Sequence, residues 1–145
     1  MTLYTIGFTQ KTAKEFFDKI ISNSIDLLID IRLNNLSQLA GFAKGKDLEY
    51  FSNEICNCKY VHDSYFAPTK ELLANYRSKK TTWQEYENIF LRIIKDRQIE
   101  ERFTKYSDYE NICLLCTEPT AEQCHRRLVA EYLSKHIKNI IIKHI

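Results

Sequence analysis

The sequence predicts an α/β protein: a single domain over residues 1–145, folded as a three-layer sandwich around a mostly parallel sheet of about five strands. Two observations lead to this prediction. Five short runs of the chain are almost continuously apolar, which is typical of strands buried on both faces. Between these runs, apolar residues recur at helical spacing. A chain of 145 residues is long enough to bury one hydrophobic core without disulfides.

The elements can be placed in order. Strands are expected at 3–6, 27–31, 59–62, 111–116 and 139–143. Three helices are expected to begin at capping boxes, where Thr12, Thr82 and Thr120 each precede a Glu or Gln by three residues. Shorter helices are expected at 46–55, 69–76 and 97–105. The segment 34–46 contains two of the three glycines and is expected to be a loop within the domain.

Composition narrows the class of protein. The formal net charge is +2, so global charge favours neither nucleic acid nor an anionic membrane, and an anion site has to come from a local cluster. No run of about 18 apolar residues predicts a membrane span, and the first residues do not resemble a secretory signal. Five cysteines, an odd number, favour reduced thiols in the cytoplasm. The oligomeric state is left open.

Polar side chains gather where the predicted strands end, which is where α/β sheets bind ligands. Thr9 follows the first strand, and His62 ends the third. Asp30 and Arg32 lie two residues apart at the end of the second strand, so they share a face and can pair. A buried Asp30 needs a partner, and the pair is either structural or a means of orienting Arg32.

The segment 118–126 is expected to open a helix. Its free N–H groups, its dipole and Arg126 would favour an anion, and Glu118 stands at its start. A cysteine in a first helical turn should have a lowered pKa, so Cys124 is a candidate nucleophile or else a packed core thiol. His125 is a base, a ligand or a surface histidine.

Several familiar sites are absent from the sequence. There is no Walker loop or dinucleotide fingerprint, and the residue six positions after Cys116 is Glu122, not the Arg of a phosphatase-type loop. Cys113-x-x-Cys116 does not predict a metal or redox site, because residues three apart in a strand point to opposite faces. Cys116, Cys124 and His125 form a partial zinc set whose spacing matches no standard structural site, so no cofactor is predicted.

Taken together, several short motifs resemble the domain-of-unknown-function 488 family. They are Tyr4-Thr5-Ile6-Gly7, Asp30-Ile31-Arg32, Gly41-Phe42-Ala43-Lys44, Tyr60-Val61-His62, Cys113-Leu114-Leu115-Cys116-Thr117-Glu118 and Cys124-His125-Arg126. The resemblance implies a compact cytoplasmic α/β protein, and it makes Asp30, Arg32, Glu118, Cys124, His125 and Arg126 signature positions. It implies no activity. Phe8 replaces a usual His and Asn35 a usual Pro, so a step that depends on that His would be lost or changed here.

The leading hypothesis is an enzyme, or an enzyme-derived binder, for a small anionic, nucleotide- or phosphate-like substrate. The residues assigned to chemistry are Cys124, Glu118, Asp30 and His125, and those assigned to the anion are Arg32, Arg126, Thr9 and His62. One alternative is a nucleic-acid-associated module that uses basic residues near Tyr76 and Trp83. The other is a zinc-stabilised interaction domain around Cys116, Cys124 and His125.

Overall fold

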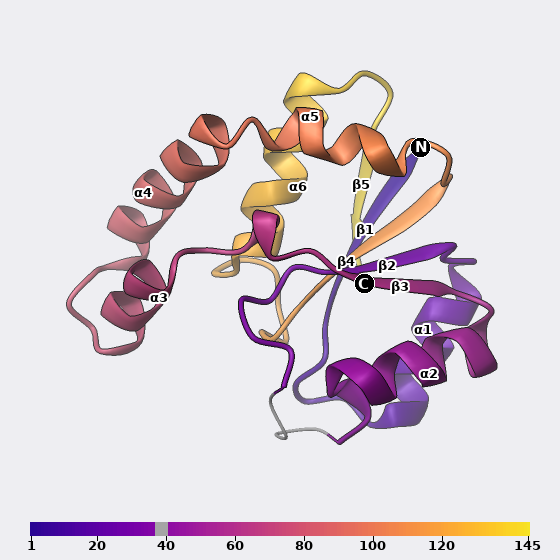
Figure 1. Ribbon diagram of the computed structural model, residues 1–145. Coiled ribbons are helices and arrows are strands. Elements are labelled where there is room, and N and C mark those ends of the chain that lie inside the picture. Colours follow the sequence, from indigo (N-terminus) through magenta and orange to yellow (C-terminus); the bar gives the residue numbers. More distant parts are fainter. Residues whose placement is uncertain (37–40) are drawn as a thin grey trace.

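The computed structural model describes residues 1–36 and 41–145 (Figure 1). Five parallel strands form one sheet in the order β3-β2-β4-β1-β5. They are β1 (Thr2–Gly7), β2 (Leu27–Asp30), β3 (Lys59–His62), β4 (Asn111–Cys116) and β5 (Ile141–His144). The predicted α/β class and the parallel five-stranded sheet are therefore confirmed. Residues 37–40 of the predicted loop lie outside the described residues.

Helices cover both faces of this sheet, because successive strand residues point to opposite sides. On one side, α1 (Ala13–Ser22) and α2 (Gly45–Cys56) pack over a core that includes Phe16, Leu28 and Leu48. On the other, α4 (Trp83–Asp96), α5 (Ile99–Phe103) and α6 (His125–His136) pack over Ile29 and Leu114. The short helix α3 (Lys70–Arg77) packs against α4. No helix in the described parts of the chain is long and apolar enough to cross a membrane.

Two of the three predicted helix starts, at Thr12 and Thr82, are confirmed. Thr12 and Glu15 form the expected reciprocal capping box, and the Thr82 hydroxyl accepts from the backbone N–H of Glu85. The third prediction was wrong: α6 begins at His125, its N-cap is Cys124, and the residues before it form turns. The other predicted elements agree with the structure to within two residues at each end.

The loop between β4 and α6, residues 117–124, is held against the end of β1. Thr9 donates from its backbone N–H at 3.3 Å and from its hydroxyl at 2.7 Å to the carbonyl of Thr117. Gly7 makes room for the loop, because a Cβ at that position would lie 1.6 Å from the carbonyl oxygen of Glu118. These tertiary contacts explain why the loop does not start a helix at Thr120 despite its local capping signal.

Candidate functional site

A cavity of about 540 Å³ opens beyond the carboxyl ends of β2 and β4 and extends under α3 and the start of α4. Its size is in the range of small-molecule sites. Four of the predicted site residues line it: Arg32, Glu118, Cys124 and His125. The lining also includes Cys116, Lys70, Arg77, Tyr76, Trp83 and Tyr86, together with Leu33, Asn34, Pro68, Leu73, Ala74, Thr117 and Gln123.

Asp30 and Arg32 form a buried ion pair at this end of the sheet. The Arg32 guanidinium donates from Nε at 2.8 Å and from Nη2 at 2.6 Å to the two carboxylate oxygens of Asp30. The neighbouring strand supplies Tyr60, whose hydroxyl donates to Asp30 at 2.7 Å. Burial raises the pKa of Tyr60, with Asp30 adding to the effect, so the hydroxyl stays protonated as a donor. Asp30 itself is fully buried and does not line the cavity, so it fixes the position of Arg32.

One nitrogen of the Arg32 guanidinium is left without a hydrogen-bond partner in the part of the chain that the structure describes. Nη2 also donates to the carbonyl of Ala43 at 2.7 Å, and the guanidinium lies 5.0 Å from the centre of the Phe8 ring. Nη1 is buried and has no hydrogen-bond partner among the described residues. Since a buried donor without a partner is costly, this nitrogen is suited to an acceptor supplied by a ligand. The Phe8 ring packs against the Arg32 guanidinium.

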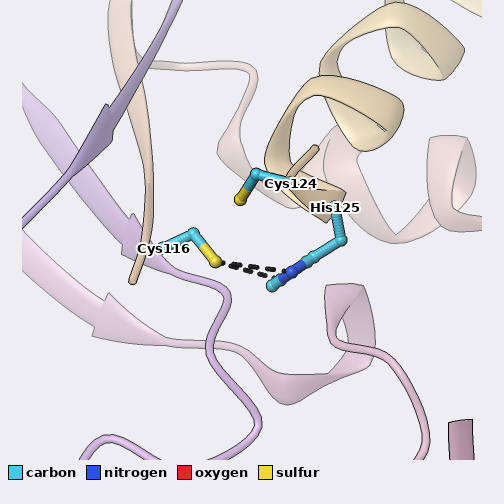
Figure 2. Close-up of side chains that lie close together, drawn as sticks. All are labelled: Cys116, Cys124 and His125. Carbon is cyan, nitrogen blue, oxygen red and sulfur yellow. Dashed lines mark hydrogen bonds between the residues drawn. The ribbon is translucent and has the colours of Figure 1, made fainter. Parts of the chain in front are cut away.

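Figure 2 shows Cys116 at the end of β4 facing Cys124 and His125 at the start of α6. Their sulfur and nitrogen ligand atoms all lie within 4.8 Å of one another, and all three residues are buried. The His125 Nε2 lies 2.9 Å from the carbonyl oxygen of Ile31, and a carbonyl only accepts, so Nε2 carries the proton. The other ring nitrogen, Nδ1, lies 3.4 Å from the Cys116 sulfur.

The two thiols of this group differ in acidity. The neighbouring Cys116 thiol lowers the pKa of Cys124 well below its usual value; burial opposes this shift, while His125 and Arg126 reinforce it. Burial raises the pKa of Cys116 well above its usual value. The sequence predicted an acidic Cys124 from a place in a helical first turn. In the structure Cys124 is the N-cap, and its side-chain neighbours are the main cause.

Three predicted anion-binding residues lie outside the cavity lining. The Arg126 guanidinium is buried behind the loop, where Nη1 donates to the Glu118 carbonyl at 2.6 Å and to the Cys124 sulfur at 3.4 Å. Thr9 holds the carbonyl of Thr117, as described above. His62 places Nε2 2.7 Å from the Arg32 carbonyl. Their contacts are therefore with the backbone and with the Cys124 thiol.

The sequence did not predict that side chains of α3 and α4 form one wall of the cavity. Tyr76 of α3 and Trp83 and Tyr86 of α4 contact one another, with the Trp83 and Tyr86 rings stacked at 5.1 Å and the Tyr76 and Trp83 rings edge-on at 5.8 Å. Exposed Lys70 and Arg77 of α3 add two cations to the same lining. The available signal was that the predicted helix 69–76 follows soon after the third strand, so its residues had to pass near the strand ends.

Within residues 1–36 and 41–145, the grouping of Cys116, Cys124 and His125 is the one set of three or more side chains arranged to hold a metal ion. Two thiolates and an Nδ1 without its proton would supply three donors, one fewer than a closed structural zinc site uses. The carbonyl of Ile31 would then orient the histidine as outer-shell partners commonly do. This is the partial zinc set that the sequence indicated.

Comparisons with known proteins identify a family but no activity. Residues 12–133 match the family described as "Domain of unknown function DUF488". This match spans most of the 145-residue chain and includes Asp30, Arg32, Glu118 and the Cys124-His125-Arg126 motif. Searches of curated proteins and of solved structures gave no significant match.

Proposed function

The chain belongs to the DUF488 family, and we propose that it is an enzyme, or an enzyme-derived binder, that takes a small anionic substrate of nucleotide or phosphate type into the cavity and acts on it with the Cys124 thiolate. The observation that carries the proposal is that an acidic thiol and the cations Arg32, Lys70 and Arg77 line one cavity. A nucleophile beside positive charge is the arrangement that reactions at anionic groups need.

Two parts of the cavity would bind the anion: its floor, formed by Arg32 at the end of β2, and its wall, formed by α3 and α4. Arg32 is held in place by its two hydrogen bonds to Asp30, and a small movement of the side chain would bring its buried Nη1 to an oxygen of the ligand. Lys70 and Arg77 are exposed at the wall and attract an anion over a longer range. The aromatic side chains of α3 and α4 give the same wall an apolar surface suited to a flat ring, which favours a nucleotide over inorganic phosphate.

We assign the chemistry to Cys124 as nucleophile, with Glu118 at the cavity lining as the acid or base. In this assignment His125, whose Nδ1 lies 3.4 Å from the Cys116 sulfur, exchanges protons with the thiols. In this assignment Asp30 and Arg126 are positioning residues. Asp30 fixes Arg32, and Arg126 fixes the loop carbonyl of Glu118 and the Cys124 sulfur.

A thermal-shift titration tests the binding step, because a ligand that binds the native state raises its apparent stability. Inorganic phosphate, nucleosides, nucleoside monophosphates and short oligonucleotides are compared on the wild type and on K70Q/R77Q. Lys46→Gln, an exposed lysine outside the cavity lining, is the matched control. We expect a saturable rise with a monophosphate that the double variant weakens and Lys46→Gln keeps. A well-folded protein that no anion stabilises would overturn the proposal.

The oligonucleotide arm also tests the nucleic-acid alternative. Tyr76 and Trp83, the residues on which that alternative rested, contact each other and line the cavity. A strand held by its phosphates would bind with an affinity that falls steeply with salt and grows with length. Binding of that kind, without a response to mononucleotides, would favour the nucleic-acid function over the one proposed.

Zinc binding is a second candidate, and the observation that favours it is the close grouping of Cys116, Cys124 and His125. Metal analysis of the purified protein separates the candidates. Stoichiometric zinc, with a loss of stability on chelation that C116S abolishes, would favour the zinc-stabilised domain. Purified protein that contains no metal and has a reactive Cys124 would favour the proposed function, in which Cys124 acts as a thiolate nucleophile.

A further inference from the structure

Cys116 is a buried thiol with no part as a nucleophile in the proposed reaction, yet it lines the cavity beside Cys124. We propose that Cys116 and Cys124 are a modification site: a hydroperoxide that enters the cavity oxidises Cys124, and Cys116 then closes a reversible disulfide with it. The inference rests on the proposed role of Cys124 as a cavity thiolate. It adds a second chemistry, oxidation by a small peroxide, to the same sulfur.

The geometry of the pair supports closure. The two sulfur atoms lie within 4.8 Å of each other, and a disulfide needs them at about 2.05 Å. Cys116 is the last residue of a strand, and Cys124 is an N-cap with extended backbone that follows a turn segment without regular structure. A rotation of the two side chains with a small shift of this segment therefore closes the gap without unwinding a strand or a helix.

The chemistry balances without a further reagent. The Cys124 thiolate attacks one oxygen of the hydroperoxide, the O–O bond breaks, and Cys124 becomes a sulfenic acid as an alkoxide (hydroxide from hydrogen peroxide) leaves. The leaving oxygen takes up the proton that the Cys124 thiol lost on ionising, and departs as an alcohol or as water. The Cys116 sulfur then attacks the sulfenic sulfur, the S–O bond breaks, and the Cys116 proton leaves with the hydroxide as water. Two thiols are oxidised by two electrons and one peroxide is reduced by two. Nδ1 of His125, 3.4 Å from the Cys116 sulfur, is placed to take up that proton in transit.

The other three cysteines are separated from this pair by the sheet. Cys58 and Cys113 belong to the core under α1 and α2, and Cys56 packs against it. Burial raises the pKa of Cys56 to about 11 and that of Cys58 to about 12, and it raises the pKa of Cys113 well above the usual value. Oxidation should therefore select Cys124 first and pair it with Cys116, although Cys113 is close in sequence.

Peptide mapping of the full chain tests the inference. Protein is treated with hydrogen peroxide, free thiols are blocked, and the chain is cut after glutamate without reduction. The Glu118–Pro119 bond resists this cleavage, so residues 111–122 carry Cys113 and Cys116 while residues 123–131 carry Cys124. We expect a reducible cross-link between these two peptides in the wild type and in C113S. C116S should lose the cross-link and instead accumulate a sulfenic acid that dimedone traps at Cys124.

A cross-link that persists in C116S, or a Cys124 that peroxide leaves unmodified in folded protein, would overturn the inference. The same holds for purified protein in which stoichiometric zinc protects both thiols. The result is distinguishable from failure of the proposed function, since the cross-link needs no anionic ligand. A cross-link in protein that binds no anion would refute the substrate proposal and leave the modification site standing.

Discussion

Replacing Asp30 by Asn tests the structural basis of the cavity floor. The carboxylate is fully buried and accepts from Arg32 Nε, Arg32 Nη2 and the Arg32 backbone N–H, at 2.8, 2.6 and 3.2 Å, and from the Tyr60 hydroxyl at 2.7 Å. The amide removes the charge and turns one acceptor into a donor that faces another donor. A buried guanidinium is then left without its counter-charge, which costs about 3–5 kcal/mol.

That loss is large against the roughly 5–15 kcal/mol by which domains are stable. For a domain of this size it should lower the melting temperature by about 6–20 °C. The assay is urea unfolding followed by circular dichroism. Asp18→Asn is the matched control, because Asp18 pairs with Lys14 on an exposed helical face and should change the free energy of unfolding by less than about 0.5 kcal/mol. A loss below about 1 kcal/mol for Asp30→Asn would refute this explanation.

Three further predictions concern the loop, the pH response and the thiol. Gly7→Ala should destabilise the protein by about 1–3 kcal/mol, because its Cβ would collide with the loop before α6. Gly41→Ala, whose Cβ would meet no atom of the described residues within 4 Å, should change the free energy of unfolding little, and chemical denaturation compares the two variants. Asp63 is buried, which favours its protonated form, but hydrogen bonds led by Arg102 lower its pKa to about 2. Its folded pKa is therefore below its unfolded pKa, so its contribution is complete above about pH 4 and is lost as the pH falls toward 2. Asp63→Asn should flatten the acid limb of a stability–pH curve, and an unchanged limb would contradict the assignment. Cys124 should react with iodoacetamide well below pH 8, where an ordinary thiol is mostly protonated. Cys113 should stay unmodified in the native protein, and mass mapping of the adducts measures both results.

The sequence predicted the sheet well because the three central strands, β1, β2 and β4, are short, mainly apolar and buried runs, and because helical periodicity separates the strands. It also predicted that Asp30 and Arg32 would share a face, since that follows from strand alternation alone. The hydrogen bond from the Tyr60 hydroxyl to Asp30 could not be predicted from strand alternation. It depends on β2 pairing with β3 in a register that sets Leu28 beside Tyr60.

The sequence predicted the site residues that follow the ends of strands. It did not predict the positions that depend on how the loop before α6 and the helices α3 and α4 pack. The false helix start at Thr120 arose because a local capping signal was outweighed by contacts of the loop with Thr9 and Arg126. Arg126 was expected in the cavity, but the close approach of the loop to Gly7 places its guanidinium behind Cys124. The aromatic wall depends on how α3 and α4 dock beyond the sheet, which no periodicity in the sequence specifies.

The central claim is that the Cys124 thiolate and an anion-binding group share one cavity. The direct test is the rate at which iodoacetamide alkylates Cys124 in the native protein, measured by mass mapping with and without a saturating nucleoside monophosphate. A ligand in the cavity should slow alkylation of Cys124, and the protection should weaken in K70Q/R77Q. A reactive Cys124 whose rate is unchanged by every phosphate tested would contradict the claim, because the thiol would then lie apart from any anion site.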